Sequence, residues 1–267
     1  MLRHAFFITE NMQAQLELAK KAAVAAGLDI MKIYETDDFD VDFKRDDSPL
    51  TKADKKGHDT IVSFLEESEL PILSEEGRSI EYSERSQWKR FWMIDPLDGT
   101  KEFIKRNGEF TVNIALIENG IPILGVVYVP VLKKLYYGLK GQGAWLDFEE
   151  NTTALKSKKS SVKLEDVKKE EKLTIVASRS HLSPETEEFI KELVNPSTIS
   201  MGSSLKFLVL AEGKADIYPR FAPTMEWDTA AAHGVLLGLN FEVRRYPELS
   251  PLEYNKENLL NPWFICY

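Results

Sequence analysis

Apolar residues recur at helical spacing near the start of the chain. Between Asn11 and Glu35 they fall on one face of a helix, as positions i, i+3, i+4 and i+7 should: Leu16, Ala19, Ala23, Ala26, Ile30 and Ile33. Asn11 is a suitable residue to cap this helix. A second helix is predicted to begin after Thr51, because Thr51 and Asp54 have the spacing of a capping box ahead of an apolar run.

Short apolar runs separated by turn signals predict an antiparallel sheet in the middle of the chain. Residues 71–77 have the pattern of a short strand that runs into a turn, and residues 92–94 end another apolar strand. The runs 110–118, 121–129, 134–139 and 144–148 then follow. Asn119–Gly120 and Gly141–Gly143 supply turn residues between them, so these runs are typical of a meander.

The second half of the chain alternates between strand and helix patterns. We expect strands at 173–177, 215–218 and 263–266, and helices at 184–194, 203–212 and 227–237, which is typical of an α/β layer. Residues 156–172 are rich in Lys, Glu and Ser and have little to bury. We therefore expect an α+β domain at 1–155, a charged connection at 156–172 and an α/β domain at 173–267.

The formal net charge of −9 excludes some partners and favours others. Binding to a nucleic-acid backbone needs clustered Lys and Arg, so nucleic acid is not expected as a partner. An acidic protein also repels a phosphorylated small molecule unless bound cations invert the local field. The charge therefore fits an enzyme that acts on phosphates with the help of a metal better than one that acts without it.

Cysteine content and hydropathy indicate the compartment. Cys266 is the only cysteine, so the chain can form no internal disulfide and a reducing compartment is favoured. The apolar run at the start is too short for a signal peptide, and no later stretch approaches the length that spans a membrane. We therefore expect a cytoplasmic protein without an integral membrane segment; peripheral attachment to the inner membrane and the oligomeric state stay open.

Asp95 and Asp98 flank Pro-Leu at the end of an apolar strand. Hard cations such as Mg²⁺ are usually bound by one or two carboxylates together with substrate phosphates, so this pair suits them. Gly99 and Thr100 follow and can open a helix, whose first N–H groups would attract a phosphate. Asp-Pro and Asp-Gly are also common turn signals, and the stretch taken alone is equally compatible with a plain turn.

Three further carboxylates also lie at predicted element ends. Asp54 opens a helix, Glu75 ends a strand, and Asp228 lies in the first turn of the helix that begins near Trp227. Side chains at element ends can converge on one cleft. If all five acidic groups meet, about two or three divalent ions could be bound there. A water activated by such an ion and oriented by Thr100 would then attack phosphorus.

Three segments, 73–76, 92–100 and 226–231, resemble the metal-binding motifs of the inositol monophosphatase superfamily, which contains lithium-sensitive, Mg²⁺-dependent phosphatases. Their order and spacing extend over nearly the whole chain. The resemblance implies a layered α-β-α-β-α sandwich of the inositol monophosphatase and fructose-1,6-bisphosphatase type. It implies that Thr100 positions the attacking water with Glu75 or Asp54, and it leaves open which carboxylate is the base. It implies metal ligands at Glu75, Asp95, the Leu97 carbonyl, Asp98 and Asp228.

Segments 48–54, 177–181, 202–206 and 215–220 are similar to the 3'(2'),5'-bisphosphate nucleotidase branch. Members of this branch hydrolyse 3'-phosphoadenosine 5'-phosphate to AMP and phosphate, in sulfur assimilation and nucleotide recycling. Such a substrate needs a cationic site for the phosphate that is not cleaved, for which Lys206, Arg220 and Ser203 are suitable. It also needs a flat group against the purine, and His181 can stack there. The substrate-binding set is completed by Gly99, Thr100 and Asp228.

Ordinary explanations exist for each substrate residue, and other functions stay open. His181 could be a plain loop residue, Lys206 and Arg220 could be solvated surface charges, and Ser203 is a candidate N-cap for the helix that follows. Another phosphatase of the same superfamily, acting on inositol monophosphate or a sugar bisphosphate, would leave His181 without a role. A protein of a different class, an inactive regulator that binds metal or nucleotide, would keep the fold without turnover.

Overall fold

The computed structural model describes residues 2–36, 42–43, 49–156, 163–178 and 183–267. A seven-stranded sheet lies at its centre, in the order β3-β4-β5-β6-β7-β8-β9. β3 runs parallel to β4, and every later neighbour is antiparallel. The predicted meander is confirmed. The strands are β3 Ile72–Ser74, β4 Arg90–Asp98, β5 Thr111–Glu118, β6 Ile121–Val129, β7 Lys134–Leu139, β8 Gly143–Phe148 and β9 Asn151–Ala154.

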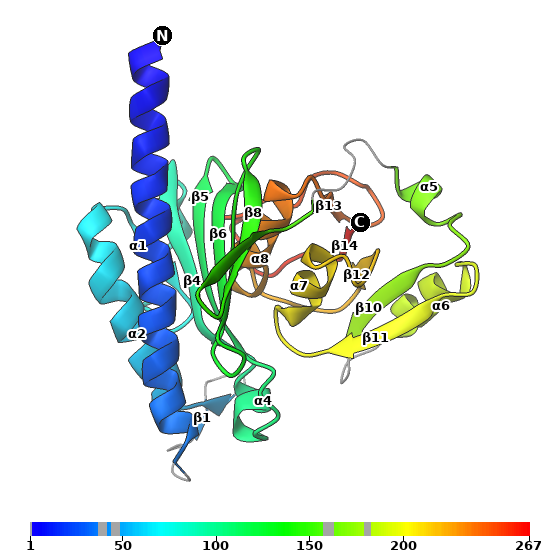
Figure 1. The fold of residues 1–267 in the computed structure, drawn as a ribbon, viewed down its shortest axis with the longest axis horizontal. Helices are drawn as coiled ribbons and strands as arrows, with labels where there is room; N and C mark the ends of the chain where they lie inside the picture. Colours follow the sequence, from blue (N-terminus) through cyan, green and yellow to red (C-terminus); the bar gives the residue numbers. More distant parts are fainter. Residues whose placement is uncertain (1, 37–41, 44–48, 157–162, 179–182) are drawn as a thin grey trace.

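Helices α1 (Leu2–Tyr34) and α2 (Lys52–Leu65) cover one face of this sheet (Figure 1). The capping box of α2 is confirmed, because the Thr51 side chain accepts from the N–H of Ala53 and Asp54 accepts from the N–H of Thr51. The predicted cap at Asn11 is wrong. The helix runs through Asn11 because the segment before it contains no Gly or Pro that would end a helix.

Several short elements connect these larger ones. Strands β1 (Asp42–Phe43) and β2 (Pro49–Leu50) pair with each other ahead of α2. A 3₁₀ turn, Glu66–Ser68, follows α2, and α3 (Tyr82–Arg85) lies between β3 and β4. Helix α4 (Thr100–Ile104) begins directly after β4. The predicted change from strand to helix at Gly99–Thr100 is therefore confirmed.

Side chains alternate between the two buried faces of the sheet. In β4, Trp92 and Ile94 pack in the core beneath α1 and α2, whereas Phe91 and Met93 pack in the core on the other face. A sheet that is covered on both faces has strands that are apolar throughout, as β4 and β5 are. The alternation places the next residue of β4, Asp95, on the face opposite to α1 and α2.

Helix α8 (Trp227–Gly238) lies on that second face and approaches the sheet closely. A Cβ atom added to Gly125 of β6 would lie 2.0 Å from the carbonyl oxygen of Ala231, and one added to Gly234 would lie 2.7 Å from the backbone nitrogen of Gly125. Only glycines allow this contact. Because α8 begins at Trp227, its packing fixes the backbone of Asp228 over the sheet.

A second layer of strands lies beyond α8 and α7 (Leu205–Ala211). β10 (Thr174–Ser178) pairs in parallel with β11 (Ser197–Met201). β12 (Tyr218–Arg220), β14 (Phe264–Cys266) and β13 (Val243–Arg245) form a three-stranded antiparallel sheet in that order. A hydrogen bond from Val176 N–H to the Ile217 carbonyl, 2.9 Å, joins the two sheets.

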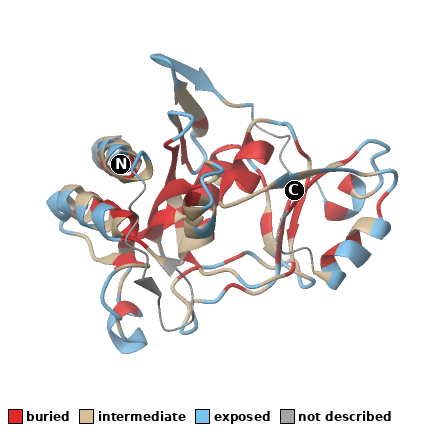
Figure 2. Cartoon of the chain, turned by 90° about the horizontal axis from the view of Figure 1, so that it is seen from below, coloured by how far each residue is buried: buried red, intermediate tan, exposed pale blue. Residues whose placement is uncertain are grey.

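Helices α5 (Leu164–Val167) and α6 (Pro184–Lys191) form the outermost layer. The predicted α-β-α-β-α sandwich is confirmed. Buried residues gather in its inner layers, and exposed residues lie on the outer helices and on the loops (Figure 2). Helix α8, which the predicted division assigns to the domain at 173–267, packs on the sheet of the domain at 1–155, so the two halves share a core.

Candidate active site

A β-bulge brings Asp95 and Asp98 to one face of the sheet. Asp95 is opposite Asn113 and Asp98 is opposite Thr111, with a register shift between the two pairs. Asn113 and Thr111 are two residues apart and share a face, so the residues opposite them share it as well. In a regular strand, residues three apart would point to opposite faces. The extra residue at Pro96–Leu97 corrects this, as bulges beside active sites commonly do.

Glu75 and Asp228 reach the same point from other elements. Glu75 directly follows β3, and its N–H donates to the carbonyl of Ile94 in the neighbouring strand at 3.2 Å. Asp228 lies in the first turn of α8. The carboxylate groups of Glu75, Asp95 and Asp228 each place an oxygen within 4.8 Å of the others. The convergence that the sequence could only suggest is therefore present for these three residues.

This group is a concentrated negative charge. Burial, and after it the carboxylates of Glu75, Asp98 and Asp228, raises the pKa of Asp95 well above its ordinary value. Burial and then Asp98 and Glu75 likewise raise the pKa of Asp228. Within the described residues, no Lys or Arg forms an ion pair with Asp95, Asp98 or Asp228. Carboxylate oxygens so arranged suit a hard divalent cation.

Asp98 lies beside this group and links it to the start of α7. Its Oδ2 atom accepts from the Ser203 hydroxyl (2.8 Å), from the Ser204 N–H (2.7 Å) and hydroxyl (2.8 Å), and more weakly from the Asn113 amide (3.4 Å). These donors all contact one oxygen, which leaves Oδ1 for another partner. Asp98 lines the same cavity as the three clustered carboxylates.

Asp54 is joined to the cavity through Thr100. The Thr100 hydroxyl donates to Asp54 Oδ1 at 3.0 Å and also lies 3.3 Å from the Leu97 carbonyl oxygen. The other oxygen of Asp54 accepts from the N–H and the hydroxyl of Thr51, at 2.7 and 2.6 Å. Burial raises the pKa of Asp54, against the lowering effect of the Thr51 hydrogen bonds. The structure thus holds Thr100 and Asp54 as a hydrogen-bonded pair.

Gly99 separates the acidic strand from α4 in a left-handed conformation, with φ of 98°. A Cβ atom here would lie 2.9 Å from the Glu109 carbonyl oxygen, so a side chain here would be strained on both grounds. The cavity that Gly99 borders is about 300 Å³. Its lining comprises Glu75, Asp95, Leu97, Asp98, Gly99, Thr100, Lys101, Glu102 and Asp228.

A second cavity of about 340 Å³ adjoins the first, and the two share Asp98, Gly99, Lys101, Glu102 and Asp228. The rest of its lining includes Ser203, Lys206 and Arg220, together with Lys105. Three of the residues that the sequence suggested for substrate binding therefore line one cavity: Ser203, Lys206 and Arg220.

Lys206 and Arg220 are not the solvated surface charges that the sequence allowed. Lys206 is 7% exposed, and burial lowers its pKa to about 8 against the opposing effect of Asp98. The Nε atom of Arg220 is buried and has no hydrogen-bond partner within the described residues, while its Nη2 donates to the Pro223 carbonyl at 3.0 Å. A buried donor without a partner favours an anionic ligand at this wall.

Ser203 does not cap α7. The helix begins at Leu205 after Ser204, and Ser203 has a positive φ of 49°. Its hydroxyl instead donates to Asp98 at 2.8 Å, in a hydrogen bond that the charge of the carboxylate strengthens. His181 lies outside the described residues.

Sequence reasoning missed two polar partners of Asp98. Asn113 is a buried amide in the apolar strand β5, and it donates to the Ser204 hydroxyl at 2.9 Å. A lone polar residue in an apolar run is the signal that could have identified it. Ser204 gave no comparable signal, because serine is common before helices.

Among the helices of the described residues, none combines the length and the hydropathy that a membrane span needs.

Comparisons with known proteins agree with this geometry. The model of the inositol monophosphatase family matches residues 11–253. The 3'(2'),5'-bisphosphate nucleotidase CysQ of Salmonella typhimurium is 44% identical over 253 residues, which cover 93% of this chain and 98% of that protein. The protein of the same name from Escherichia coli K12 is 45% identical over 243 residues, covering 90% and 94%.

Solved structures show the same likeness. The crystal structure of CysQ from Bacteroides thetaiotaomicron has a TM-score of 0.81 and 47% identity, and covers 95% of this chain and 97% of that one. The suhB protein of Bartonella henselae has a TM-score of 0.74 at 22% identity, over 95% and 93% of the two chains, and so shares the fold.

Proposed function

Because this chain belongs to the inositol monophosphatase family, we propose that it is a Mg²⁺-dependent 3'(2'),5'-bisphosphate nucleotidase that converts 3'-phosphoadenosine 5'-phosphate to AMP and phosphate. Members of the family are generally Mg²⁺-dependent, and the relatives named as this nucleotidase are 44–45% identical over most of the chain. The substrate is taken from their names and from the two adjoining cavities.

The observation that carries the proposal is the pairing of an acidic cavity with a basic one. A bisphosphate nucleotide presents one phosphate to be cleaved and one to be held. The carboxylate-lined cavity suits the first phosphate with its cations, and the wall with Lys206 and Arg220 suits the second. A monophosphate would leave the buried Nε of Arg220 without a partner. Ser203, on the same wall, completes the proposed site for the second phosphate.

In this proposal, Mg²⁺ would be held by the side chains of Glu75, Asp95, Asp98 and Asp228 and by the Leu97 carbonyl. About two or three ions would fit a site of this donor number. Mg²⁺ supplies positive charge to the phosphate oxygens and lowers the pKa of water. Asp95 is suited to a central role because repulsion from its neighbours is relieved only by a cation or a proton.

Thr100 and Asp54 would position and deprotonate the attacking water. A hydroxyl has one hydrogen, and Thr100 directs it to Asp54 or to the Leu97 carbonyl. Its lone pairs are then free to accept a hydrogen bond from water. The water proton would pass by way of the Thr100 hydroxyl to Asp54 while the new P–O bond forms. The bond to the ribose oxygen breaks, and that oxygen would take up a proton from solvent water. Between the two candidate bases, the geometry favours Asp54, and Glu75 is left as a metal ligand.

Gly99 and Thr100 border the acidic cavity, so we propose that their backbone contacts the phosphate to be cleaved. His181 remains a proposal from the sequence for stacking on the purine. Cys266 is the only cysteine and is buried, so the chain forms no internal disulfide. We therefore propose a cytoplasmic location, since such a chain does not depend on an oxidising compartment.

A panel of phosphoesters tests the function. We would measure kcat/KM with Mg²⁺ for 3'-phosphoadenosine 5'-phosphate, 3'-AMP, inositol monophosphate and fructose 1,6-bisphosphate, with and without lithium. The proposal requires the adenosine bisphosphate to be the best substrate. A preference for inositol monophosphate or the sugar bisphosphate would assign the chain to another branch, and nucleotide binding without any turnover would indicate a regulator.

Arg220→Ala sharpens this test. Loss of a charged hydrogen bond of about 1.5–3 kcal/mol should raise KM for the bisphosphate by about 10- to 150-fold. KM for 3'-AMP, which lacks the second phosphate, should change little. Equal increases for both substrates would remove Arg220 from the site of the second phosphate.

A further inference from the structure

The start of α8 lacks the side-chain cap that usually fixes a helix N-terminus. Glu226 occupies the N-cap position with helical backbone angles, φ −59° and ψ −39°, and makes no capping hydrogen bond. Instead, the Asp228 carboxylate accepts the N–H of Met225 at 2.9 Å. The orientation of the Asp228 carboxylate therefore depends on where the backbone of residues 224–226 lies.

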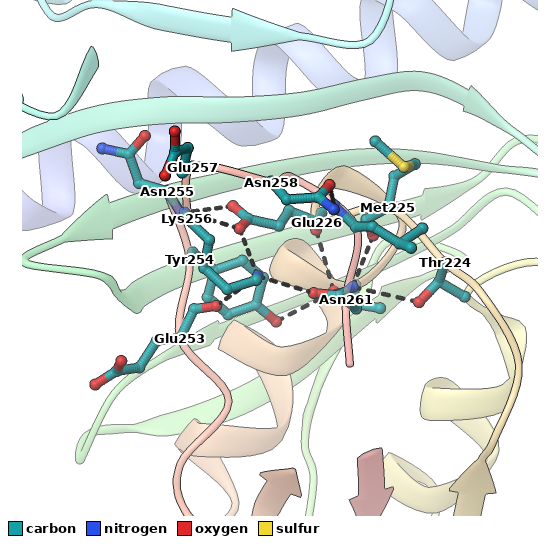
Figure 3. A network of polar contacts seen from close by, with 12 residues as sticks. Thr224, Met225, Glu226, Glu253, Tyr254, Asn255, Lys256, Glu257, Asn258 and Asn261 are labelled. Atoms are coloured by element: carbon teal, nitrogen blue, oxygen red, sulfur yellow. Dashed lines mark hydrogen bonds and ion pairs between the residues drawn. The ribbon is translucent and has the colours of Figure 1, made fainter. Parts of the chain in front are cut away.

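A loop near the C-terminus, residues 253–261, holds that backbone in place (Figure 3). Met225 forms an isolated antiparallel bridge with Leu260. The N–H of Asn261 donates to the carbonyl of Thr224 at 2.8 Å. The segment before Asp228 is thus paired like a short strand with this loop, which we call the clamp loop.

The side chain of Asn261 makes a second set of contacts with the same segment. It is 5% exposed, and its Nδ2 lies 2.8 Å from the Met225 carbonyl oxygen, 3.1 Å from the Thr229 hydroxyl and 3.3 Å from the Thr224 hydroxyl. An amide has two hydrogens, so these acceptors share them. They lie on both sides of Asp228 in the sequence, and one side chain therefore spans the residue that points to the cation site.

An ion pair between the buried Glu226 and the half-buried Lys256 closes the other end of the clamp loop. The carboxylate of Glu226 is fully buried and accepts from Lys256 Nζ (2.5 Å) and from the N–H groups of Asn255 (2.5 Å) and Lys256 (3.0 Å). Lys256 Nζ also lies 3.4 Å from Asn261 Oδ1. A buried carboxylate is costly without such partners, so Glu226 favours the closed position of the loop.

Arg85 in α3 anchors the loop to the first half of the chain. Its guanidinium donates to Asn255 Oδ1 and to the carbonyls of Lys256 and Glu257, at 2.9, 2.6 and 2.7 Å. The amide of Asn255 donates back to the Arg85 carbonyl at 2.7 Å. The clamp loop is therefore fixed at one side to α3 and at the other to the start of α8.

We propose that Asn261 is a positioning residue for the cation site: its amide, supported by the Lys256–Glu226 pair, holds residues 224–229 so that the Asp228 carboxylate faces Asp95. The proposal rests on the proposed function for its catalytic consequence, but its effect on cation binding is independent of it. Thr224 and Thr229 also line the second cavity, so the same amide should influence substrate binding.

The test compares the full chain with Asn261→Ala and with Asn258→Ala. Asn258 belongs to the same loop, is exposed, and only accepts the N–H of Leu260 at 2.9 Å. Binding of Mn²⁺ alone is measured from the spectroscopic signal of the free ion, at a temperature where circular dichroism shows each variant folded. Asn261 acts on Asp228 through Met225, whose N–H the Asp228 carboxylate accepts. Loss of a direct partner of a metal ligand commonly costs about 10- to 100-fold, so the less direct change Asn261→Ala should weaken Mn²⁺ binding by about 10-fold. Asn258→Ala should stay within about twofold.

The kinetic readout distinguishes positioning from a purely structural role. Asn261→Ala should raise the Mg²⁺ concentration for half-maximal activity by the same factor as the Mn²⁺ dissociation constant, and kcat should recover largely at saturating Mg²⁺. A loss of thermal stability with unchanged Mn²⁺ affinity would overturn the proposal. If Asn261→Ala does not fold, Asn261→Ser, which retains one donor, replaces it. This variant should weaken Mn²⁺ binding by a smaller factor, and wild-type Mn²⁺ affinity would overturn the proposal.

Failure of the two proposals can be told apart. If no phosphoester is hydrolysed but Asn261→Ala weakens Mn²⁺ binding, the clamp loop stands and the proposed function falls. If the adenosine bisphosphate is hydrolysed and Mn²⁺ affinity is unchanged in the variant, the function stands and the clamp loop falls.

Discussion

Asp95→Asn should change stability in opposite directions with and without a divalent cation. Asp95 is 2% exposed and belongs to the group of carboxylates whose oxygens lie within 4.8 Å of one another. At an effective dielectric constant of about 20, two unit charges 4.8 Å apart repel by about 3.5 kcal/mol. The amide keeps the shape of the side chain and can still accept the N–H of Leu97, which donates to Asp95 Oδ1 at 3.0 Å.

Without a cation, the substitution should therefore raise the free energy of unfolding. We expect a gain on the order of 1–3 kcal/mol, less than the full pair repulsion because the wild-type cluster relieves part of it by taking up protons. With a cation, the wild type should gain about 4.1 kcal/mol at a concentration about 1,000 times the dissociation constant. The variant binds the cation poorly and should gain little, so the order of stability reverses.

Urea unfolding at a mildly alkaline pH, in excess EDTA or in saturating Mg²⁺, measures the four free energies. Asp59→Asn is the matched control, because Asp59 is exposed and its replacement makes the same change in charge. Asp59→Asn should leave the free energy of unfolding unchanged both in EDTA and in Mg²⁺. If Asp95→Asn destabilises the protein equally in EDTA and in Mg²⁺, repulsion among these carboxylates is not a term in the stability, and the reasoning is refuted.

Three further outcomes are expected. Gly99→Ala should cost roughly 1–3 kcal/mol of stability, because φ is 98° and the new Cβ would lie 2.9 Å from a backbone oxygen. Gly141 has a φ of 71° and nothing within 4 Å of an added Cβ, so Gly141→Ala measures the cost of the backbone conformation alone. Equal losses of stability in urea unfolding would contradict the steric contribution at Gly99. Asp54→Asn should lower kcat by roughly 10²- to 10⁴-fold with little change in KM, since the amide can still accept from Thr100 but cannot take up a proton from water; unchanged steady-state kinetics would exclude Asp54 as the base. Burial lowers the pKa of His233 from 6.5 to about 3. Between these two pH values the unfolded chain therefore takes up a proton on this residue and the native protein does not. Urea-derived stability should then fall by about 1.4 kcal/mol for each pH unit below about 6.5, and His233→Gln should flatten that slope whatever its own stability; an unchanged slope would assign the effect to other groups.

Periodicity predicted the parts of the fold that depend on local sequence. The four strands of the meander and the helix after Thr51 were recovered because alternation and capping are properties of neighbouring residues. The first helix was recovered but not its start, since Asn11 can cap a helix or continue one. Strands β11 and β13 were missed because both are short and are defined by the strands beside them.

The candidate site was predicted in its membership but not in its geometry. Acidic residues at element ends could be identified from the chain, and Glu75, Asp95 and Asp228 do converge. The bulge that turns Asp95 and Asp98 to one face could not be identified from the chain, because it is a register shift against β5 and so depends on a partner strand. The contacts of the clamp loop could not be predicted either, because they join residues about 30 positions apart through one amide and one ion pair.

Asp98 explains why the acidic and basic cavities are parts of one site. Its Oδ2 is occupied by donors from residues 203 and 204, which open α7, and the same residue lines both cavities. The backbone that ends β4 and the backbone that begins α7 are therefore held together through a carboxylate that also faces the cation site. Lys206 is the second residue of α7 and donates to the Ser203 carbonyl at 2.5 Å, so its position follows from that of Asp98. The spacing between the cation site and the anion-binding wall is thus set by protein hydrogen bonds before any ligand arrives, which is what discrimination between a bisphosphate and a monophosphate requires.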